Sequence, residues 1–388
     1  MTIEIESILA DLVAIPSLPG TPNAAIVDRV RAELARHGVE SAVIAGPEGD
    51  RFNLFATIGP RDQPGYILSG HMDVVPAEGQ VWATDPFRLA SDGVRLSGRG
   101  TTDMKGFLAC VLAMVPEFLG MPLTRPVHIA FSYDEEIGCR GVGHMIERLP
   151  ALCARPAGCI VGEPTEMRPV LSHKGKQALE LVIEGRAGHS SNPALGENAL
   201  YPAAELLLFI RDRAARLAAE GPFDARFSPP HATLQAGVVH GGNAVNIIPD
   251  CASIEIEVRS VPGLPPAAVT AEVVAELAAL ADRAVAEGRH LRVSHRELSS
   301  YPALPPPEER TLASLLERLT GHASLPSVSY GTEAGLFHAA GIPAIVCGPG
   351  AIVRAHRANE YILKSELEAC RGMLRGLGAV LCGGREPF

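Results

Sequence analysis

The stretch GYILSGHMDVVP, residues 65–76, holds the two features on which both fold and site depend. Its first half is an apolar run of strand length, typical of a strand buried in a sheet. Its second half places His71 and Asp73 two residues apart, just after that run. Ligands of open α/β sheets bind beyond the carboxyl ends of the strands, so the stretch predicts a strand that leads into a site.

The surrounding sequence alternates strand and helix patterns, which predicts an α/β fold. Short apolar runs lie at 53–59, 126–133 and 158–164, and helical patterns at 21–38 and 103–119. After about residue 306 the same alternation returns, with helices at 307–319 and from 364, and a strand within 343–350. We therefore expect a catalytic domain with a mixed sheet and helices on both faces.

The middle of the chain has a different pattern. Alternating strands at 177–185, 232–241, 251–260 and 290–298 surround two long helices at about 198–219 and 267–286. This order predicts an α+β, ferredoxin-like unit with one exposed sheet face. The expected domains are 1–177, an insertion at 178–290, and 291–388.

Composition limits the classes of partner. The chain has 388 residues, 47% hydrophobic and 20% charged, with a formal net charge of -10. Nucleic acid and anionic membranes attract basic surfaces, so neither is expected as a partner. The first residues lack the pattern of a signal peptide, no apolar run reaches membrane-span length, and eight scattered cysteines form no Cys-x-x-Cys pair. We expect a cytoplasmic protein with reduced cysteines.

Carboxylates and imidazoles recur where predicted strands end. One such residue alone is more often a cap or a turn residue, but several at one sheet edge favour a metal site. Nitrogen and oxygen ligands suit Zn²⁺, Co²⁺ or Mn²⁺. Five ligands exceed what one hydrolytic ion needs, and fit two ions about 3.5–4 Å apart that share a carboxylate. The five are His71, Asp103, Glu163, His356 and one of the adjacent Glu135 and Glu136, whose neighbour stays free as a general base.

A set of motifs resembles the M20 family of dinuclear metallopeptidases over nearly the whole chain. The motifs are SGHMDVVP, GRGTTDMKG, YDEEIG, GEPT, GHSSNPALGENA, GGNAVNIIPD with EVRSVPG, and GTEAGLF…GPG…AHRANEYI. Within the family the sequence is most similar to the acetylornithine deacetylases, through GRGTTDMKGF, HKGK, NIIPD and GPG.

The resemblance implies a role for each residue of the centre. His71 binds one metal and His356 the other, Asp103 bridges both, and Glu136 and Glu163 each bind one. Glu135 is the general base. Asp73 is not a ligand but accepts a hydrogen bond from the far nitrogen of His71, and the Asp103–Met104 peptide is cis. The implied cofactors are two divalent ions, Zn²⁺ or Co²⁺, with Mn²⁺ as a further option.

The resemblance also assigns residues of the insertion, which it implies to be a lid and dimerisation domain of a homodimer. His189 stabilises the oxyanion, from its own chain or from the partner subunit; without the resemblance it reads as a surface turn residue. Asn246 and Arg259 are candidates to bind substrate, and the two-pronged guanidinium of Arg259 suits a carboxylate. A surface arginine at a strand end is the competing interpretation.

Three positions depart from the family pattern. Thr102 stands where cysteine is expected, Ala351 replaces a serine, and Arg354 adds a charge near His356. Because the segment of Ala351 and Arg354 borders the implied substrate pocket, these changes leave the acyl or side-chain specificity open.

The implied reaction is hydrolysis of an N-acyl amino acid. The resemblance favours N2-acetyl-L-ornithine, hydrolysed to L-ornithine and acetate, a step of arginine biosynthesis. The alternatives are another M20 activity, namely an aminoacylase, a succinyl-diaminopimelate desuccinylase, or a dipeptidase or carboxypeptidase. A non-catalytic amino-acid-binding relative is a second alternative, but it should have lost the base or a ligand, and all are present here.

Overall fold

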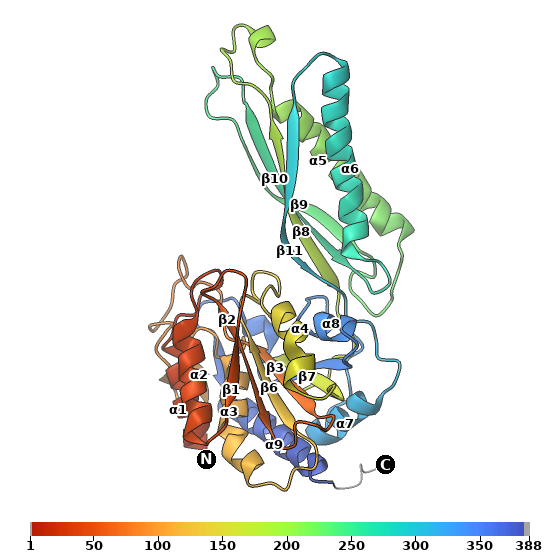
Figure 1. The fold of residues 1–388 in the computed structure, drawn as a ribbon. Coiled ribbons are helices and arrows are strands. Elements are labelled where there is room, and N and C mark those ends of the chain that lie inside the picture. The colour runs from red at the N-terminus through yellow and green to blue at the C-terminus, as the bar shows by residue number, and fades with distance from the viewer. Residues whose placement is uncertain (1, 384–388) are drawn as a thin grey trace. The chain divides into compact units, whose positions relative to one another are not determined.

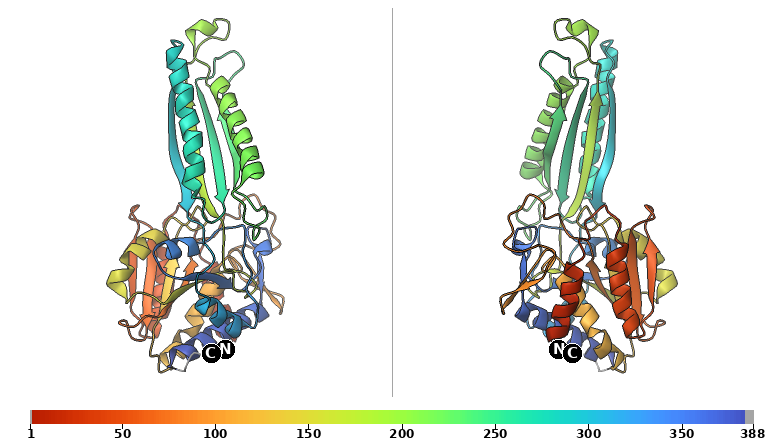
Figure 2. Two further views of the ribbon diagram at one scale, coloured as in Figure 1. Left: turned by 90° about the vertical axis from the view of Figure 1, so that its right-hand side faces the viewer. Right: turned by 90° about the vertical axis from the view of Figure 1, so that its left-hand side faces the viewer.

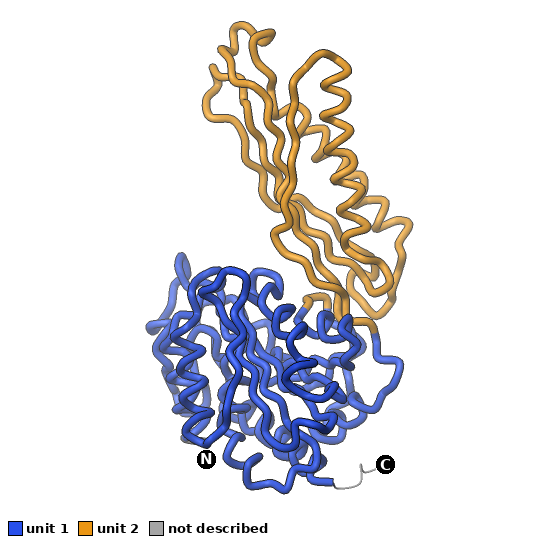
Figure 3. The backbone as a smooth tube through the Cα atoms, in the orientation of Figure 1, with its two compact units in different colours: residues 1–172, 306–328, 332–388 blue, residues 173–305, 329–331 orange. Residues whose placement is uncertain are grey.

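The computed structural model describes residues 2–383, which form two compact units (Figure 3). Of the described residues, the first unit combines 2–172, 306–328 and 332–383, and the second combines 173–305 and 329–331. The second unit starts before residue 178 and ends after residue 290. It does so because its first and last strands, β8 (Gly175–Glu184) and β11 (Arg292–Tyr301), extend past both of these expected boundaries.

The first unit is built around a six-stranded mixed sheet of order β1-β2-β6-β3-β7-β12 (Figure 1). Strands β6, β3, β7 and β12 run parallel to one another, whereas the pairs β1–β2 and β2–β6 are antiparallel. The carboxyl ends of the parallel strands therefore share one edge. The strands are β1 (Ser41–Ala45), β2 (Phe52–Ile58), β3 (Tyr66–His71), β6 (Val127–Ser132), β7 (Gly158–Pro164) and β12 (Ala344–Gly348).

Helices cover both faces of this sheet, as the alternation of patterns predicted. Side chains of successive strand residues point to opposite faces, so Leu54 and Leu68 join the large core under one helical layer while Phe55 and Ile67 face the other. The helical layer over Leu54 and Leu68 contains α1, α2, α3, α7 and α9. On the other face of the sheet, α4 packs with α8. The helices are α1 (Thr2–Val13), α2 (Ala24–Arg36), α3 (Lys105–Leu119), α4 (Val142–Leu152), α7 (Thr311–Thr320), α8 (Ala334–Ala339) and α9 (Lys364–Leu381).

The second unit has the β-α-β-β-α-β order of a ferredoxin-like fold, which confirms the predicted architecture. Its four strands pair antiparallel in the order β11-β8-β10-β9, with β9 (Thr233–Gly241) and β10 (Cys251–Ser260). Helices α5 (Leu200–Glu220) and α6 (Pro266–Ala286) lie on the same side of this sheet (Figure 2). Strands β8 and β10 alternate buried and half-buried residues, because only one of their faces is covered.

Three short strands, β4 (Ala90–Ser91), β5 (Arg95–Ser97) and β13 (Tyr361–Leu363), form a third sheet in the first unit. All eight cysteines are unpaired. Within residues 2–383, none of the helices combines the length and the apolar character that crossing a membrane requires.

Candidate metal centre

The polar residues singled out from the sequence lie together at the carboxyl edge of the first unit's sheet. His71 is the last residue of β3, and Glu163 lies near the end of β7. Glu135 and Glu136 follow β6. Two further residues come from loops: Asp103 precedes α3, and His356 follows a short 3-10 turn after β12.

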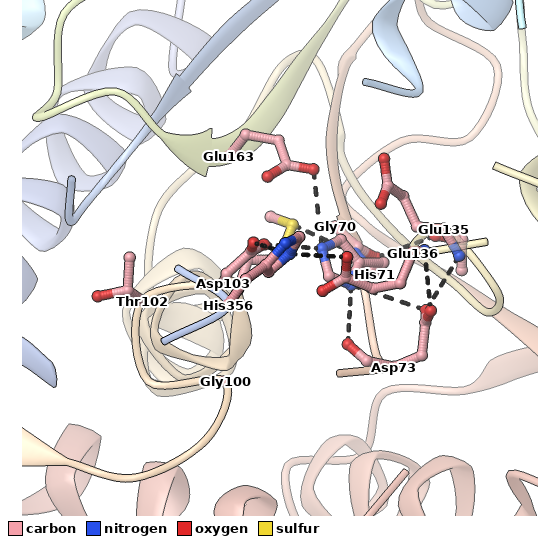
Figure 4. A network of polar contacts seen from close by, with 12 residues as sticks. Gly70, His71, Asp73, Gly100, Thr102, Asp103, Glu135, Glu136, Glu163 and His356 are labelled. Carbon is pink, nitrogen blue, oxygen red and sulfur yellow. Dashed lines mark hydrogen bonds and ion pairs between the residues drawn. The ribbon is translucent and has the colours of Figure 1, made fainter. Parts of the chain in front are cut away.

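Asp103 lies between the two histidines and presents one carboxylate oxygen to each (Figure 4). Its Oδ1 is 3.1 Å from His71 Nε2, and its Oδ2 is 3.2 Å from His356 Nε2. Each histidine also faces one glutamate: His71 Nε2 is 3.7 Å from Glu163 Oε1, and His356 Nε2 is 3.0 Å from Glu136 Oε2. The centre therefore consists of two half-sites that share Asp103.

Glu135 lies beside the first half-site. Potential ligand atoms of Glu135, His71 and Glu163 are all within 4.8 Å of one another. The thiol of Cys139 donates a hydrogen bond to Glu135 Oε1 at 3.3 Å. Glu135 is thus near enough to the half-site to exchange a proton with a group bound there.

Asp73 is adjacent to the centre but contacts it differently from the expectation. The Nδ1 of His71 lies 2.9 Å from the backbone oxygen of Asp73, and 3.7 Å from the nearer carboxylate oxygen. The carboxylate instead accepts the backbone N–H groups of Glu135 and Glu136, both at 3.1 Å. Asp73 therefore holds the His71 ring through its main chain and the Glu135–Glu136 turn through its side chain.

Crowding changes the proton affinity of these carboxyls. Burial raises the pKa of Glu135 to about 8, with the charge of Glu136 adding to the effect. Burial and the charge of Asp103 raise the pKa of Glu136 to about 7, and burial raises that of Glu163 well above its ordinary value. A nearby cation would lower all three pKa values, because it favours the ionised form.

At the two histidines and Asp103, by contrast, the surroundings favour the charged form. Although burial opposes it, hydrogen bonds from His356 and His71 hold the pKa of Asp103 below its ordinary value. Hydrogen bonds to Asp103 and Glu136 raise the pKa of His356 to about 10. Burial lowers the pKa of His71, but the hydrogen bond to Asp103 and the charges of the surrounding carboxylates together raise it well above its ordinary value. In this arrangement, protons on the histidine nitrogens and on carboxyl oxygens neutralise the negative charge of the clustered acids. A bound metal ion can neutralise that charge instead.

The residues of the centre fit divalent cations. Two imidazole nitrogens and several carboxylate oxygens form a donor set suited to zinc, cobalt or manganese. Oxygen Oε1 of Glu136 is buried and accepts no hydrogen bond from residues 2–383. A buried oxygen of this kind is costly unless a donor or a cation satisfies it.

Close packing of α3 on β7 fixes the end of the strand that carries Glu163. A Cβ atom at Gly162 would lie 2.2 Å from the ring of Phe107, so only glycine lets α3 pack this closely on β7 beside Glu163. The Asp103–Met104 peptide bond is cis, as the family resemblance implied. Met104 is fully buried in the main core.

The three other predicted site residues belong to the second unit, and the cluster described above contains none of them. His189 is exposed and its Nδ1 accepts the backbone N–H of Ser191. Asn246 is also exposed. Arg259 forms a two-pronged pair with Glu257, at 2.8 and 3.3 Å, and donates to the Tyr301 hydroxyl at 2.9 Å.

The positions that depart from the family pattern have identifiable partners. The hydroxyl of Thr102 donates to the backbone oxygen of Tyr361 at 2.6 Å, and Ala351 is buried. Arg354 pairs with Glu366 at 2.7 Å, and its guanidinium lies 4.6 Å from the centre of the Tyr361 ring. The added charge is thus balanced by Glu366.

Sequence reasoning missed three buried charged residues around the centre. Glu333 accepts a hydrogen bond from Ser69 at 3.2 Å, and burial raises its pKa to about 7. Arg99 and Glu360 form a buried ion pair at 2.8 Å. All three lie inside the quoted motifs, GTEAG, GRGTTD and AHRANEYI, but only their position among charged neighbours indicates a role.

Comparison with known proteins agrees with this geometry. The sequence profile described as peptidase family M20/M25/M40 matches residues 67–378. Acetylornithine deacetylase of Pectobacterium carotovorum subsp. carotovorum (strain PC1) is 34% identical over 320 residues, which cover 81% of this chain and 79% of that protein.

Solved structures share the fold over almost the whole chain. The M20 family metallo-carboxypeptidase Sso-CP2 from Sulfolobus solfataricus is 18% identical, with a TM-score of 0.76 over 98% of this chain and 99% of that one. The YXEP protein of Bacillus subtilis, described as a dinuclear metal binding peptidase, is 15% identical, with a TM-score of 0.66 over 98% of both chains. The profile and the deacetylase establish that this chain belongs to peptidase family M20/M25/M40, as a metallohydrolase.

Proposed function

We propose that the protein hydrolyses N-acyl amino acids at a centre of two metal ions, with N2-acetyl-L-ornithine as substrate and L-ornithine and acetate as products. The observation that carries the proposal is the presence of two histidine–glutamate pairs, one on each oxygen of Asp103. The similarity to an acetylornithine deacetylase supports the choice of substrate.

Each half-site supplies the ligands for one ion. His71 and Glu163 would hold one cation, His356 and Glu136 the other, and Asp103 would bridge them. Zn²⁺ or Co²⁺ suits these donors, and Mn²⁺ is a further option. When bound, such ions lower the pKa of a water and polarise the substrate carbonyl.

Glu135 is proposed as the general base. It accepts a proton from the attacking water as the oxygen of that water bonds to the carbonyl carbon. When the carbon–nitrogen bond breaks, Glu135 returns this proton to the leaving amine. Asp73 keeps Glu135 in place through the hydrogen bond to its backbone N–H.

The second unit is proposed to complete the substrate site. His189 would stabilise the oxyanion, from the same chain or from the partner of a homodimer, and Asn246 and Arg259 would bind the amino-acid part. For Arg259 this requires the substrate carboxylate to compete with Glu257, which already occupies its guanidinium. Arg259→Ala should therefore raise KM more than it lowers kcat if it binds substrate, and change neither if it is only structural.

The homodimer is supported by the edge strand β9, where Val238 and Val239 are exposed. An open strand edge offers unpaired backbone groups to a second copy. Analytical ultracentrifugation tests this proposal, and a monomer at all concentrations contradicts it. A cytoplasmic location is part of the proposal and rests on the unpaired cysteines.

The decisive experiment combines a substrate panel with one variant. N2-acetyl-L-ornithine, other N-acyl amino acids, N-succinyl-diaminopimelate and dipeptides are compared by kcat/KM with Zn²⁺, Co²⁺ or Mn²⁺ supplied. If another substrate has the highest kcat/KM, that substrate replaces N2-acetyl-L-ornithine in the proposal, and the family assignment is unaffected. Glu135→Gln should keep its metal and lose turnover; near-normal turnover would rule out Glu135 as the base.

A further inference from the structure

The two half-sites differ in what holds their ligands. His71 and Glu163 lie on the central strands β3 and β7, which the ladder of the sheet fixes. Asp103 and His356 lie on loops, and His356 has a φ of 60°, outside regular structure. Something other than the sheet must therefore set the position of His356 relative to Asp103.

Glu360 holds the loop that carries Asp103. Its carboxylate is buried, with the residue 2% exposed, and each oxygen accepts two hydrogen bonds. Oxygen Oε1 accepts the backbone N–H groups of Thr102 and Asp103 at 2.8 and 3.0 Å. Oxygen Oε2 accepts the N–H of Gly100 at 3.0 Å and a guanidinium N–H of Arg99 at 2.8 Å. One anion thus fixes the orientation of three backbone amides just ahead of the bridging carboxylate.

Arg99 continues this connection to the other loop. Its guanidinium donates to the backbone oxygen of Arg357 at 3.3 Å and to Gln80 Oε1 at 2.6 Å. The amide nitrogen of Gln80 in turn donates to the backbone oxygen of His356 at 3.0 Å. An unbroken series of hydrogen bonds therefore runs from the backbone of Asp103 through Glu360, Arg99 and Gln80 to the backbone of His356.

We propose that the buried Arg99–Glu360 pair is a positioning pair that sets the distance between Asp103 and His356 and so the affinity of the second metal ion. The inference rests on the proposed two-metal centre. Neither residue contacts the metal-binding atoms, so the pair acts through Asp103 and His356. The half-site of His71 and Glu163, held by strands, should depend on it far less.

The test is a titration of metal-free protein with Co²⁺, followed by its visible absorption and by the metal content after dialysis. Wild-type protein should bind two equivalents. Glu360→Gln replaces one acceptor oxygen by an NH₂ group that faces backbone N–H donors. The second equivalent of Co²⁺ should therefore bind to this variant about 10–100-fold more weakly than to the wild type. Its first equivalent should bind as in the wild type.

The matched control is Glu117→Gln, which breaks another glutamate–arginine pair of the first unit, with Arg371 and Arg375, away from the centre. It should bind both equivalents as the wild type does. A folded Glu360→Gln with two normal equivalents, or with both weakened alike, overturns the inference. So does a weakened second equivalent in the control.

A second variant covers the case in which Glu360→Gln does not fold. Gln80→Ala removes the partly exposed link to His356 and leaves the buried pair intact. It should weaken the second equivalent only, and unchanged binding would again overturn the inference. The wild type separates the two proposals. Fewer than two equivalents bound to the wild type refutes the two-metal centre itself, whereas two equivalents that bind wild type and variants with the same affinity refute only the positioning pair.

Discussion

Replacement of Asp73 by asparagine tests how the centre is organised. Asp73 is 4% exposed, and its carboxylate accepts the N–H groups of Glu135 and Glu136, one on each oxygen. Asparagine keeps one acceptor oxygen and turns an NH₂ group towards the other amide. One hydrogen bond to a charged acceptor, worth about 1.5–3 kcal/mol, is lost, and the other becomes a weaker neutral bond.

The expected loss of unfolding free energy is therefore about 2–4 kcal/mol, which a protein with about 5–15 kcal/mol tolerates. Both amides belong to functional residues, the proposed base Glu135 and the proposed ligand Glu136. We expect kcat to fall about 10–100-fold while two metal ions stay bound at saturating metal. His71→Ala should instead lose one ion outright, because it removes a ligand atom.

The assay measures kcat with metal in excess and metal content by mass spectrometry for both variants. The control is Asp92→Asn, since Asp92 also accepts two backbone N–H groups, from Val94 and Arg95, in an exposed turn. It should retain wild-type kcat. If Asp73→Asn loses as much metal as His71→Ala, Asp73 is a ligand and the account of its role is wrong; wild-type kcat would contradict it equally.

Three further outcomes follow from the same structure. Removal of metal by a chelator should lower the thermal midpoint, because an ion at 1,000 times its Kd stabilises the folded state by about 4 kcal/mol; an unchanged midpoint in a fluorimetric scan would contradict a metal centre in the native fold. Burial lowers the pKa of His128 from 6.5 to about 4, so the folded state binds fewer protons than the unfolded state between these pH values. The free energy of unfolding therefore falls by about 3 kcal/mol as the pH falls from 6.5 to 4. In urea titrations His128→Asn should weaken this pH dependence, and an identical slope would show that another group causes it. Gly162→Ala should cost about 1–3 kcal/mol, since the new Cβ meets the Phe107 ring, and an unchanged urea midpoint would show that this contact relaxes freely.

The sequence predicted the parts of the fold that repeat a simple pattern. Strands β3, β6 and β7 are buried on both faces, so their apolar runs and the polar residues after them were recognisable. Strand β1 and helix α4 were not predicted. Strand β1 is a short, half-exposed edge strand, and α4 contains Gly143 and Pro150, which weaken its helical pattern.

The residues of the metal centre were predictable from the sequence, but their pairing was not. Strand ends and family motifs pointed to the cluster, but which glutamate faces which histidine was open until the distances paired Glu163 with His71 and Glu136 with His356. Glu360 could not be recognised, because its backbone partners lie 257–260 residues away along the chain. From the sequence alone, such a residue cannot be distinguished from an exposed glutamate on the surface.

Burial of several acids in one place is a problem that the fold must solve. Like charges close together destabilise the folded state unless protons or cations neutralise them. Here Asp103 is matched by two histidines, whereas burial raises the pKa values of Glu135, Glu136 and Glu163. Cation binding therefore displaces protons and supplies part of the folding free energy. In the proposed two-metal centre, His71 and Glu163 are held by strands of the sheet, whereas Asp103 and His356 lie on loops. The buried Arg99–Glu360 pair hydrogen-bonds to the backbone of both loops, and so supports the centre where the sheet does not.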